Sequence, residues 1–392
     1  MARILGIKIS ILNRQEISER WDLFLTSDRP HLVTTPNPEI ILAARKDEEY
    51  FYILNQADLA IADGFGLVLA GHLGGKKFTR LTGSDITPEL LTKAEKEAYP
   101  VAVLNWNAGL SSAVEIDNAL KLKWPQLNSK VLDIPREVRL TESELKVLEN
   151  FAPKIVFCTL GAPWQEKLLW RSLPQLKSTR IAIGIGGSFD FITRKAIRAP
   201  QFWRQLGLEW LWRLIKQPRR FKRIWRATVV FGLKVLKETL INPLVYRHNV
   251  VILIYSIIGK QPRILIVKRQ DEPGHWQLPQ GGTDGQGLKK GGLREAREEL
   301  GLSNLQVKGV YPHLHSYRFK SGRNKKTNYK GQRQGLLIAE FLGSDDEVAI
   351  NYWDHSAWRW VKPEDLVASV HPHRQAGAQK FLNKFLETIK YE

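Results

Sequence analysis

Cysteine is almost absent from this sequence, and long apolar runs are missing altogether. Because Cys158 is the only cysteine in 392 residues, no disulfide can form within the chain, which fits a reducing compartment. No run of 18 apolar residues occurs, so we expect no membrane-spanning helix. Residues 1–10 are strand-like and lack the apolar stretch and cleavage site of a signal peptide. These absences predict a cytoplasmic protein.

Acidic residues are also in short supply. The chain has 59 lysines and arginines against 40 aspartates and glutamates, which gives a net charge of +19. Such an excess favours anionic partners, including RNA, nucleotides and membrane surfaces. A hydrophobic content of 43% is normal for a folded protein, and a length of 392 residues is typical of two domains.

The most informative segment is 294–302, which reads Arg-Glu-Ala-Arg-Glu-Glu-Leu-Gly-Leu. Glu295, Glu298 and Glu299 have the spacing i, i+3, i+4, so in a helix they share one face. Clustered carboxylates repel one another unless a cation offsets them, and oxygen ligands suit Mg²⁺ or Mn²⁺. A solvated helix face is the ordinary alternative. The glycine-rich loop at 281–287 weighs against it, because an ion beside such a loop can bind a diphosphate and activate water.

This pattern resembles the Nudix box of hydrolases that cleave nucleoside diphosphates linked to another moiety. The second half of the box matches fully over 294–302, with Gly301 ending the helix. The preceding loop is one residue short, so Gly281 or Gly282 takes the glycine role and Gln286 stands where the box has glutamate. The resemblance implies a helix whose Glu295, Glu298 and Glu299 bind the metal, with Glu298 and Glu299 also catalytic. We expect Arg294 to orient one of these carboxylates through a salt bridge.

Three further segments, 276–282, 331–334 and 358–361, resemble the Nudix branch that acts on dinucleoside polyphosphates and on RNA 5′ ends. In that branch an acidic metal ligand lies four residues before the last segment, where this chain has Asp354. A simple turn residue is the open alternative for this position. The resemblance covers roughly residues 248–390 and implies an α/β/α sandwich.

The first half of the chain alternates strand-like and helix-like segments, as α/β domains do. Helices are expected at 38–44 and 88–98. In open parallel sheets, ligands bind at the carboxyl ends of the strands, so the polar residues there are the candidates for a site. The expected strands are 32–35, 59–62, 101–104, 155–160 and 181–185.

The blocks that follow these strands resemble the WecG/TagA/CpsF family, glycosyltransferase family 26, over roughly residues 1–230. The blocks are 34–39, 62–66, 80–85, 161–166, 184–190, 198–200 and 207–214. The resemblance implies a Rossmann-like fold and an inverting transfer of an N-acetylhexosamine, typically N-acetylmannosamine, from UDP to a polyprenyl-diphosphate-linked sugar. It implies no metal in this half.

In the family, the aspartate of the Ala-Asp-Gly block is the general base, here Asp63, and the alternative is a turn-forming residue. Two departures from the family pattern, the loop 105–109 and Arg194 in place of glycine, put the donor sugar in question. The resemblance also places four residues in the substrate pocket: Thr35, Asn37, Arg80 and Gln165.

Residues 203–226 combine eight basic side chains with tryptophan, phenylalanine and aliphatic residues. This composition suits a helix lying on anionic lipid, and arginine forks also suit a diphosphate. An amphipathic helix docked on its domain is the alternative. A second basic stretch, 318–333, either approaches a polyphosphate or RNA 5′ end or is a solvated loop. The candidate diphosphate contacts in the first stretch are Arg213, Arg219 and Arg220.

We therefore predict an α/β enzyme with a transferase domain at 1–233, whose residues 203–233 form a basic appendage, a linker at 234–248 and a Nudix domain at 249–392. The expected protein is bifunctional and peripheral on the inner face of the cell membrane. It requires UDP-sugar, lipid-linked acceptor and, for the Nudix half, Mg²⁺ or Mn²⁺. Two alternatives stay open: the Nudix half is a non-catalytic nucleotide sensor, or the chain is mainly an RNA or dinucleotide polyphosphate pyrophosphohydrolase.

Overall fold

The computed structural model divides the chain into two compact units, Met1–Thr239 and Leu240–Glu392. It describes residues 1–75, 78–200, 202–203, 209–216, 218, 221–283, 285–319 and 328–390, with the backbone alone at 213 and 216. No helix in these ranges is long and apolar enough to cross a membrane.

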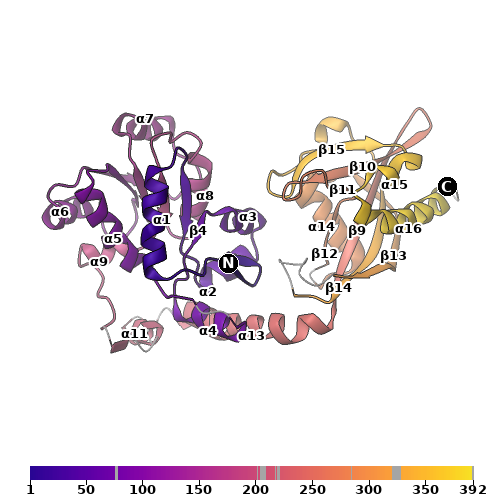
Figure 1. The fold of residues 1–392 in the computed structure, drawn as a ribbon. Coiled ribbons are helices and arrows are strands. Elements are labelled where there is room, and N and C mark those ends of the chain that lie inside the picture. Colours follow the sequence, from indigo (N-terminus) through magenta and orange to yellow (C-terminus); the bar gives the residue numbers. More distant parts are fainter. Residues whose placement is uncertain are drawn as a thin grey trace. The chain divides into compact units, whose positions relative to one another are not determined.

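The first unit is built on a six-stranded parallel sheet in the order β4-β3-β8-β7-β5-β6 (Figure 1). A separate antiparallel hairpin, β1 (Ala2–Ile4) and β2 (Ile7–Ile9), stands at the amino terminus. The sheet strands are β3 (His31–Thr34), β4 (Leu59–Ala60), β5 (Val101–Trp106), β6 (Ser129–Ile134), β7 (Ile155–Cys158) and β8 (Ile181–Gly184).

Helices connect the strands of this sheet and cover both of its faces. On β5, Val101 and Val103 pack into one hydrophobic cluster and Ala102 and Leu104 into another, so the strand is buried on both sides. Such double burial is typical of parallel sheets. The helices are α1 (Arg14–Thr26), α2 (Pro38–Ala44), α3 (Glu48–Gln56), α4 (Phe65–Leu73), α5 (Gly83–Lys96), α6 (Ala113–Lys123), α7 (Glu142–Phe151), α8 (Trp164–Ser172) and α9 (Ser188–Ile192).

Local signals explain where these elements begin. Helix α2 spans the predicted residues because Asn37 caps it and Pro38 occupies its first turn. Helix α5 starts at Gly83, five residues before the expected start, because Thr82 and Asp85 form a capping box. The edge strand β6 was not predicted, because its residues are mostly exposed or half-buried and form no apolar run.

A helical segment lies on the carboxyl side of the first unit. Within it, Phe231 and Val235 are buried against the hairpin, α2 and α4. The residues predicted as a linker, 234–248, are helical up to Leu244, and strand β9 begins at Tyr246. The pieces are α11 (Glu209–Lys216), α12 (Phe221–Trp225), the π-helical turn η2 (Arg226–Val230), α13 (Phe231–Leu236), η3 (Lys237–Ile241) and η4 (Asn242–Leu244).

The second unit is a mixed seven-stranded sheet between helices. Its main path is β11-β10-β9-β14-β13, with β12 paired to β9 and β15 to β10. Only the β9–β14 pair is parallel among the described pairs. The strands are β9 (Tyr246–Ile258), β10 (Gln261–Arg269), β11 (Trp276–Gln277), β12 (Gln280–Gly282), β13 (Leu305–Arg318), β14 (Gly331–Phe341) and β15 (His355–Val361).

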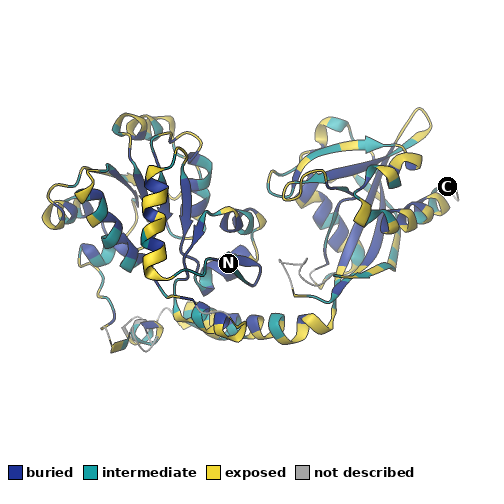
Figure 2. Cartoon of the chain, viewed as in Figure 1, coloured by how far each residue is buried: buried dark blue, intermediate teal, exposed yellow. Residues whose placement is uncertain are grey.

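Alternation along β9 divides the core of this unit into two layers. Val250, Ile252 and Ile254 face helix α14 (Leu288–Leu300), whereas the residues between them face α16 (Pro372–Ile389). The central strands β9, β10 and β14 are largely dark blue in Figure 2, and exposed residues lie on the outer faces of the helices. The short helices are η5 (Asp345–Glu347), η6 (Pro363–Asp365) and α15 (Leu366–Ser369). The predicted fold class, an α/β transferase-like unit followed by an α/β/α Nudix-like unit, is confirmed.

Candidate active sites

In the first unit, Asp63 and the loop after β3 lie side by side at the carboxyl ends of the strands. The backbone N–H of Asp63 donates a hydrogen bond to the carbonyl oxygen of Pro36 over 2.8 Å. Gly64 follows with φ of 98°, a conformation that favours glycine, and this turn leads into α4. Asp63 is half-buried. The structure therefore joins two segments that the sequence analysis selected separately.

Thr35 and Asn37 both anchor the loop after β3. The buried Thr35 hydroxyl donates to the carbonyl oxygen of Gly184 over 3.2 Å, which links β3 to the end of β8. The Asn37 side-chain oxygen accepts from the N–H of Ile40 over 2.9 Å as the cap of α2. The half-buried position of Asn37 leaves it near the edge of the sheet, next to the Asp63 turn.

Arg80 connects the sheet edge to the basic segment. Its guanidinium lies 2.7 Å from a carboxylate oxygen of Glu209, the first residue of α11. Of the predicted diphosphate contacts, Arg213 lies in α11 with only its backbone described. Arg219 and Arg220 lie outside the described residues.

Where the structure describes the basic segment, its apolar side chains are exposed or half-buried. Trp210, Phe221 and Trp225 have exposed fractions of 39%, 55% and 50%. One cation of the segment, Arg223, pairs with Glu39 at the start of α2 over 2.6 Å. Exposed aromatic rings beside basic residues are typical of a helix that contacts an interface.

The structure describes both departures from the family pattern, Arg194 and the loop 105–109. Arg194 adopts φ of 62°, the left-handed region, which explains why a glycine suits this position. In the loop 105–109, the Arg136 guanidinium stacks 3.6 Å above the ring of Trp106. Arg136 follows β6, and no sequence signal pointed to it, because the contact joins the ends of two strands.

In the second unit, the three box glutamates lie on α14 as predicted by their spacing. A Cβ atom built on Gly281 would stand 1.9 Å from the Cδ atom of Glu295, so only glycine leaves room for this carboxylate. Arg294 donates to Glu295 over 2.7 Å, to Glu298 over 2.5 Å and to the carbonyl oxygen of Gly282 over 2.8 Å. Arg294 thus orients two of the carboxylates and ties them to the glycine loop.

Glu299 and Asp354 belong to the same corner of the unit. The buried His355 ring nitrogen lies 3.2 Å from Glu299. The side chain of Asn351 donates to the carbonyl oxygen of Glu298 over 2.9 Å and accepts from the N–H of Asp354 over 3.1 Å. These bonds bring the turn that carries Asp354 against the end of α14. Sequence reasoning selected neither His355 nor Asn351, since both contact α14 from more than 50 residues away.

The donor set of this corner fits a hard divalent cation. Glu295, Glu298, Glu299 and Asp354 supply only carboxylate oxygens, which Mg²⁺ and Mn²⁺ prefer. The space that a side chain at Gly281 would fill is occupied by Glu295, so the carboxylates approach the sheet closely.

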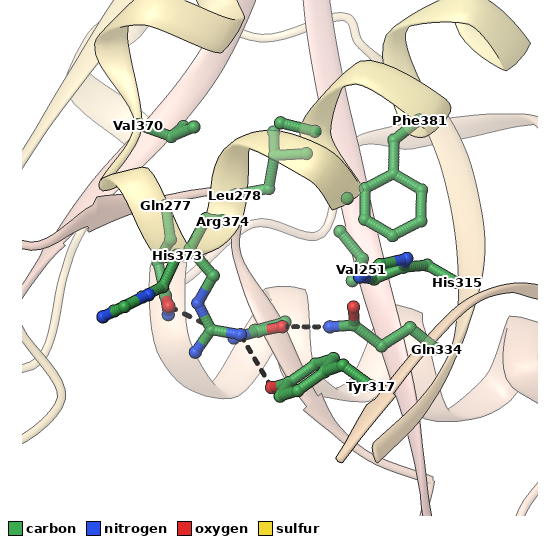
Figure 3. Close-up of a pocket in the computed structure, with 13 residues that line it drawn as sticks. Val251, Gln277, Leu278, His315, Tyr317, Gln334, Val370, His373, Arg374 and Phe381 are labelled. Atoms are coloured by element: carbon green, nitrogen blue, oxygen red, sulfur yellow. Dashed lines mark hydrogen bonds between the residues drawn. The ribbon is translucent and has the colours of Figure 1, made fainter. Parts of the chain in front are cut away.

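A small pocket lies on the opposite, α16 face of β12. Figure 3 shows Arg374 of α16 at its centre, with its guanidinium directed towards the Tyr317 hydroxyl, 3.0 Å away. The side-chain amides of Gln334 and Gln280 meet over 2.8 Å. Phe381 and Val251 supply apolar walls. The pocket therefore combines amide and guanidinium groups with an apolar lining.

A second cluster of metal-type ligands stands beside this pocket. Ligand atoms of Glu272, His275 and His371 lie within 4.8 Å of one another, the only such group of three within the described residues. Burial, together with the nearby charges of Arg374 and Arg269, lowers the pKa of His275 to about 4. The same guanidinium charges disfavour a cation at this cluster.

Comparison with known proteins assigns both units, which together define a two-domain enzyme with a glycosyltransferase unit and a Nudix hydrolase unit. The model of the glycosyl transferase WecG/TagA/CpsF family matches residues 2–243, and the NUDIX domain model matches residues 246–385. The chain belongs to the WecG/TagA/CpsF family and carries a Nudix domain.

Two curated relatives illustrate the two halves. The N-acetylglucosaminyldiphosphoundecaprenol N-acetyl-beta-D-mannosaminyltransferase of Bacillus subtilis is 32% identical over 53% of this chain and 79% of its own length. The RNA pyrophosphohydrolase of Wolbachia pipientis is 36% identical over 37% of this chain and 92% of its own length. Among solved structures, an Ap4A hydrolase of C. elegans matches 36% of this chain and 98% of its own, with 21% identity and a TM-score of 0.29.

Proposed function

We propose that the first unit transfers N-acetylmannosamine, or a related N-acetylhexosamine, from a UDP-sugar to a polyprenyl-diphosphate-linked sugar during synthesis of a cell-surface polysaccharide. The observation that carries this proposal is the placement of Asp63 against the Thr35–Asn37 loop at the carboxyl edge of the parallel sheet. The similarity to mannosaminyltransferases of this family supports the choice of sugar and acceptor.

Asp63 acts as the general base in this reaction. Its carboxylate removes the proton of the acceptor hydroxyl while that oxygen attacks the anomeric carbon from the face opposite the departing UDP, which inverts the configuration. The leaving diphosphate gains negative charge, and guanidinium groups stabilise it through bidentate hydrogen bonds. Arg213, Arg219 and Arg220 are the proposed contacts, and Thr35, Asn37 and Arg80 shape the pocket. The reaction needs no metal in this unit.

The basic segment also places the enzyme at its lipid substrate. The exposed rings of Trp210, Phe221 and Trp225, among lysines and arginines, suit the headgroup region of an anionic membrane. We propose peripheral attachment to the inner face of the cell membrane, where polyprenyl-diphosphate acceptors reside. Arg80 links the substrate pocket directly to this segment through Glu209.

The second unit hydrolyses a diphosphate linked to a nucleoside. Glu295, Glu298, Glu299 and Asp354 would hold Mg²⁺ or Mn²⁺, which would polarise the diphosphate and lower the pKa of water. Arg294 keeps the Glu295 and Glu298 carboxylates in place. Glu298 and Glu299 are the proposed catalytic residues. The amide and guanidinium groups of the α16 pocket suit a nucleoside, and the similarity to an RNA pyrophosphohydrolase favours a 5′-phosphorylated RNA or a dinucleoside polyphosphate.

One assay of the purified full-length protein tests both activities. It measures release of UDP, other mononucleotides, phosphate and diphosphate in the presence of Mg²⁺ from UDP-N-acetylmannosamine, UDP-N-acetylglucosamine, diadenosine tetraphosphate and 5′-triphosphorylated RNA. Each substrate is tested with and without a lipid-diphosphate-linked N-acetylglucosamine acceptor. The transferase predicts UDP only with acceptor, and the hydrolase predicts acceptor-independent cleavage. Absence of both products overturns both assignments.

Gln286 in place of the box glutamate favours one alternative, that the second unit senses nucleotides without cleaving them. The variant Glu298→Gln separates the two ideas, with the exposed Glu364→Gln as its charge-matched control. Metal-dependent cleavage that falls about 100-fold or more in Glu298→Gln, and stays unchanged in the control, excludes the sensor. Nucleotide binding without cleavage in the wild type establishes it. If the wild-type chain releases UDP no faster with acceptor than without, it is mainly a pyrophosphohydrolase.

A further inference from the structure

A buried chain of side-chain hydrogen bonds runs from α3 to the carboxyl edge of the first sheet. The Tyr50 hydroxyl donates to one oxygen of Glu166 over 3.1 Å. The side-chain nitrogen of Gln165 donates to the other oxygen of Glu166 over 2.8 Å. Tyr50 and Glu166 are fully buried, and Gln165 is 2% exposed. These hydrogen-bonded side chains are therefore shielded from solvent.

The far end of this chain holds two loops at once. The side-chain oxygen of Gln165 accepts from the backbone N–H of Gly161 over 3.1 Å and from that of Gly186 over 3.0 Å. Gly161 follows β7 and Gly186 follows β8, and both adopt a positive φ. A Cβ atom at Gly184 would lie 2.6 Å from the Gln165 nitrogen, so glycine permits the amide to reach between the strands.

The same point also touches the loop after β3. The carbonyl oxygen of Gly184 accepts from the Thr35 hydroxyl, and β3, β8 and β7 are neighbours in the sheet. One side chain, Gln165, therefore binds the loops after two strands and packs against the residue that anchors a third. The loop after β3 carries Thr35 and Asn37, which are proposed to shape the substrate pocket.

The orientation of the Gln165 amide is decided by Glu166. A glutamine amide presents an acceptor on one side and donors on the other. A buried carboxylate accepts hydrogen bonds, so the NH₂ group of Gln165 faces Glu166. The side-chain oxygen of Gln165 then faces the two loop N–H groups. With the amide reversed, its NH₂ group would face two N–H donors, and the loops would lose their common partner.

The cost of this arrangement indicates that it serves more than packing. Burial raises the pKa of Glu166, since the ionised carboxylate is separated from water, although the hydrogen bonds from Gln165 and Tyr50 oppose that effect. Burial beside Glu166 likewise raises the pKa of Tyr50 well above its ordinary value. An apolar side chain would fill the same space without a desolvation cost.

We propose that Glu166 is a positioning residue of the transferase, which orients the Gln165 amide and thereby holds the Gly161 and Gly186 turns in the geometry that binds substrate. This inference rests on the transferase function proposed above. It also assigns Gln165 a role through the loops, in place of the direct substrate contact that its sequence block implied. A displacement of about 1 Å in such loops lowers turnover by up to about 100-fold.

An exchange of the two side chains tests the proposal. In Gln165→Glu, one carboxylate oxygen still accepts from both loops, but the other faces Glu166, and two adjacent carboxylates must share a proton. We expect kcat relative to wild type to fall about 10-fold or more at pH 8 and to recover as the pH is lowered towards 6. The double variant Gln165→Glu with Glu166→Gln restores every donor and acceptor, so its kcat recovers and the pH dependence disappears.

The exposed change Gln175→Glu controls for the added charge, and thermal melting controls for folding. A wild-type pH profile in Gln165→Glu, or a loss that follows the fraction of unfolded protein, overturns the proposal, as does a double variant no better than the single one. The kcat of each variant is compared with that of wild-type UDP release in the presence of acceptor. A wild type that transfers no sugar instead refutes the proposed function, and the positioning role fails with it.

Discussion

Gly281 and Glu295 are fitted to each other so closely that a methyl group on the glycine would overlap the glutamate carboxyl group. The contact identifies which glycine of the shortened loop supports the acidic helix. Gly282, the other candidate, contributes its carbonyl oxygen to Arg294. The loop is one residue short of the Nudix pattern, yet it still reaches the carboxylates of α14.

We predict that Gly281→Ala lowers the metal-dependent hydrolysis by about 100-fold or more, because Glu295 must move away from the other ligands. Overpacking of this kind also costs about 1–3 kcal/mol of stability. Gly287→Ala is the matched control, since a Cβ atom there meets nothing within 4 Å. Phosphate release and thermal melting of both variants check the prediction. Equal hydrolysis by the two variants would contradict the role of this contact.

Asp63→Asn is expected to abolish sugar transfer and to leave hydrolysis unchanged. The amide keeps the size and turn geometry of the aspartate but accepts no proton from the acceptor, so kcat falls by about 10²–10⁴-fold. Asp28→Asn, an exposed aspartate of the same unit, serves as the control. Acceptor-dependent UDP release measures transfer and cleavage of a nucleotide substrate measures hydrolysis. Transfer at the wild-type rate in Asp63→Asn would assign the base to another residue.

The second unit is expected to lose stability in acid through His275. Burial, Arg374, Arg269 and His371 lower its pKa to about 4 in the folded state, although Glu272 opposes them. The unfolded chain takes up this proton near pH 6.5, so between pH 6.5 and 4 the unfolded state binds more protons. The free energy of unfolding therefore decreases as the pH is lowered from 6.5 to 4, by about 1–3 kcal/mol.

Urea unfolding of the full chain from pH 7 to 4 measures this effect, with hydrogen exchange separating the two units. His275→Gln flattens the dependence in the second unit, whereas His72→Gln, an exposed position of the first unit, does not. An unchanged slope in His275→Gln would assign the acid sensitivity to other groups.

Cys158 is predicted to be inert in the native protein. Its side chain is fully buried in β7, and burial raises the pKa of the thiol to about 12. Thiolate is the reactive form, so a thiol reagent at pH 8 should label the chain only as the first unit unfolds. The exposed variant Ser143→Cys should react within the mixing time. Rapid labelling of the wild type would show that the sheet opens readily around β7.

The sequence allowed much of the fold to be predicted because the signals are local. Asn37 and Pro38 start α2 at the residues where the sequence predicts a helix. The spacing of the box glutamates likewise predicted their common face on α14. Where a signal was weak, as along the half-exposed edge strand β6, the element was missed.

The candidate sites show the same division. Caps, turns, buried strands and the glutamate face follow from residues a few positions apart, so the sequence by itself determined these elements and the two families they indicate. Only the tertiary structure decided that Gly281 lies under Glu295, that His355 meets Glu299, that Arg80 reaches Glu209 and that Gln165 holds two loops. All but the last of these join residues more than ten positions apart, and the last depends on which strands are neighbours. Strand order and packing set such distances, and local propensity and periodicity do not encode them.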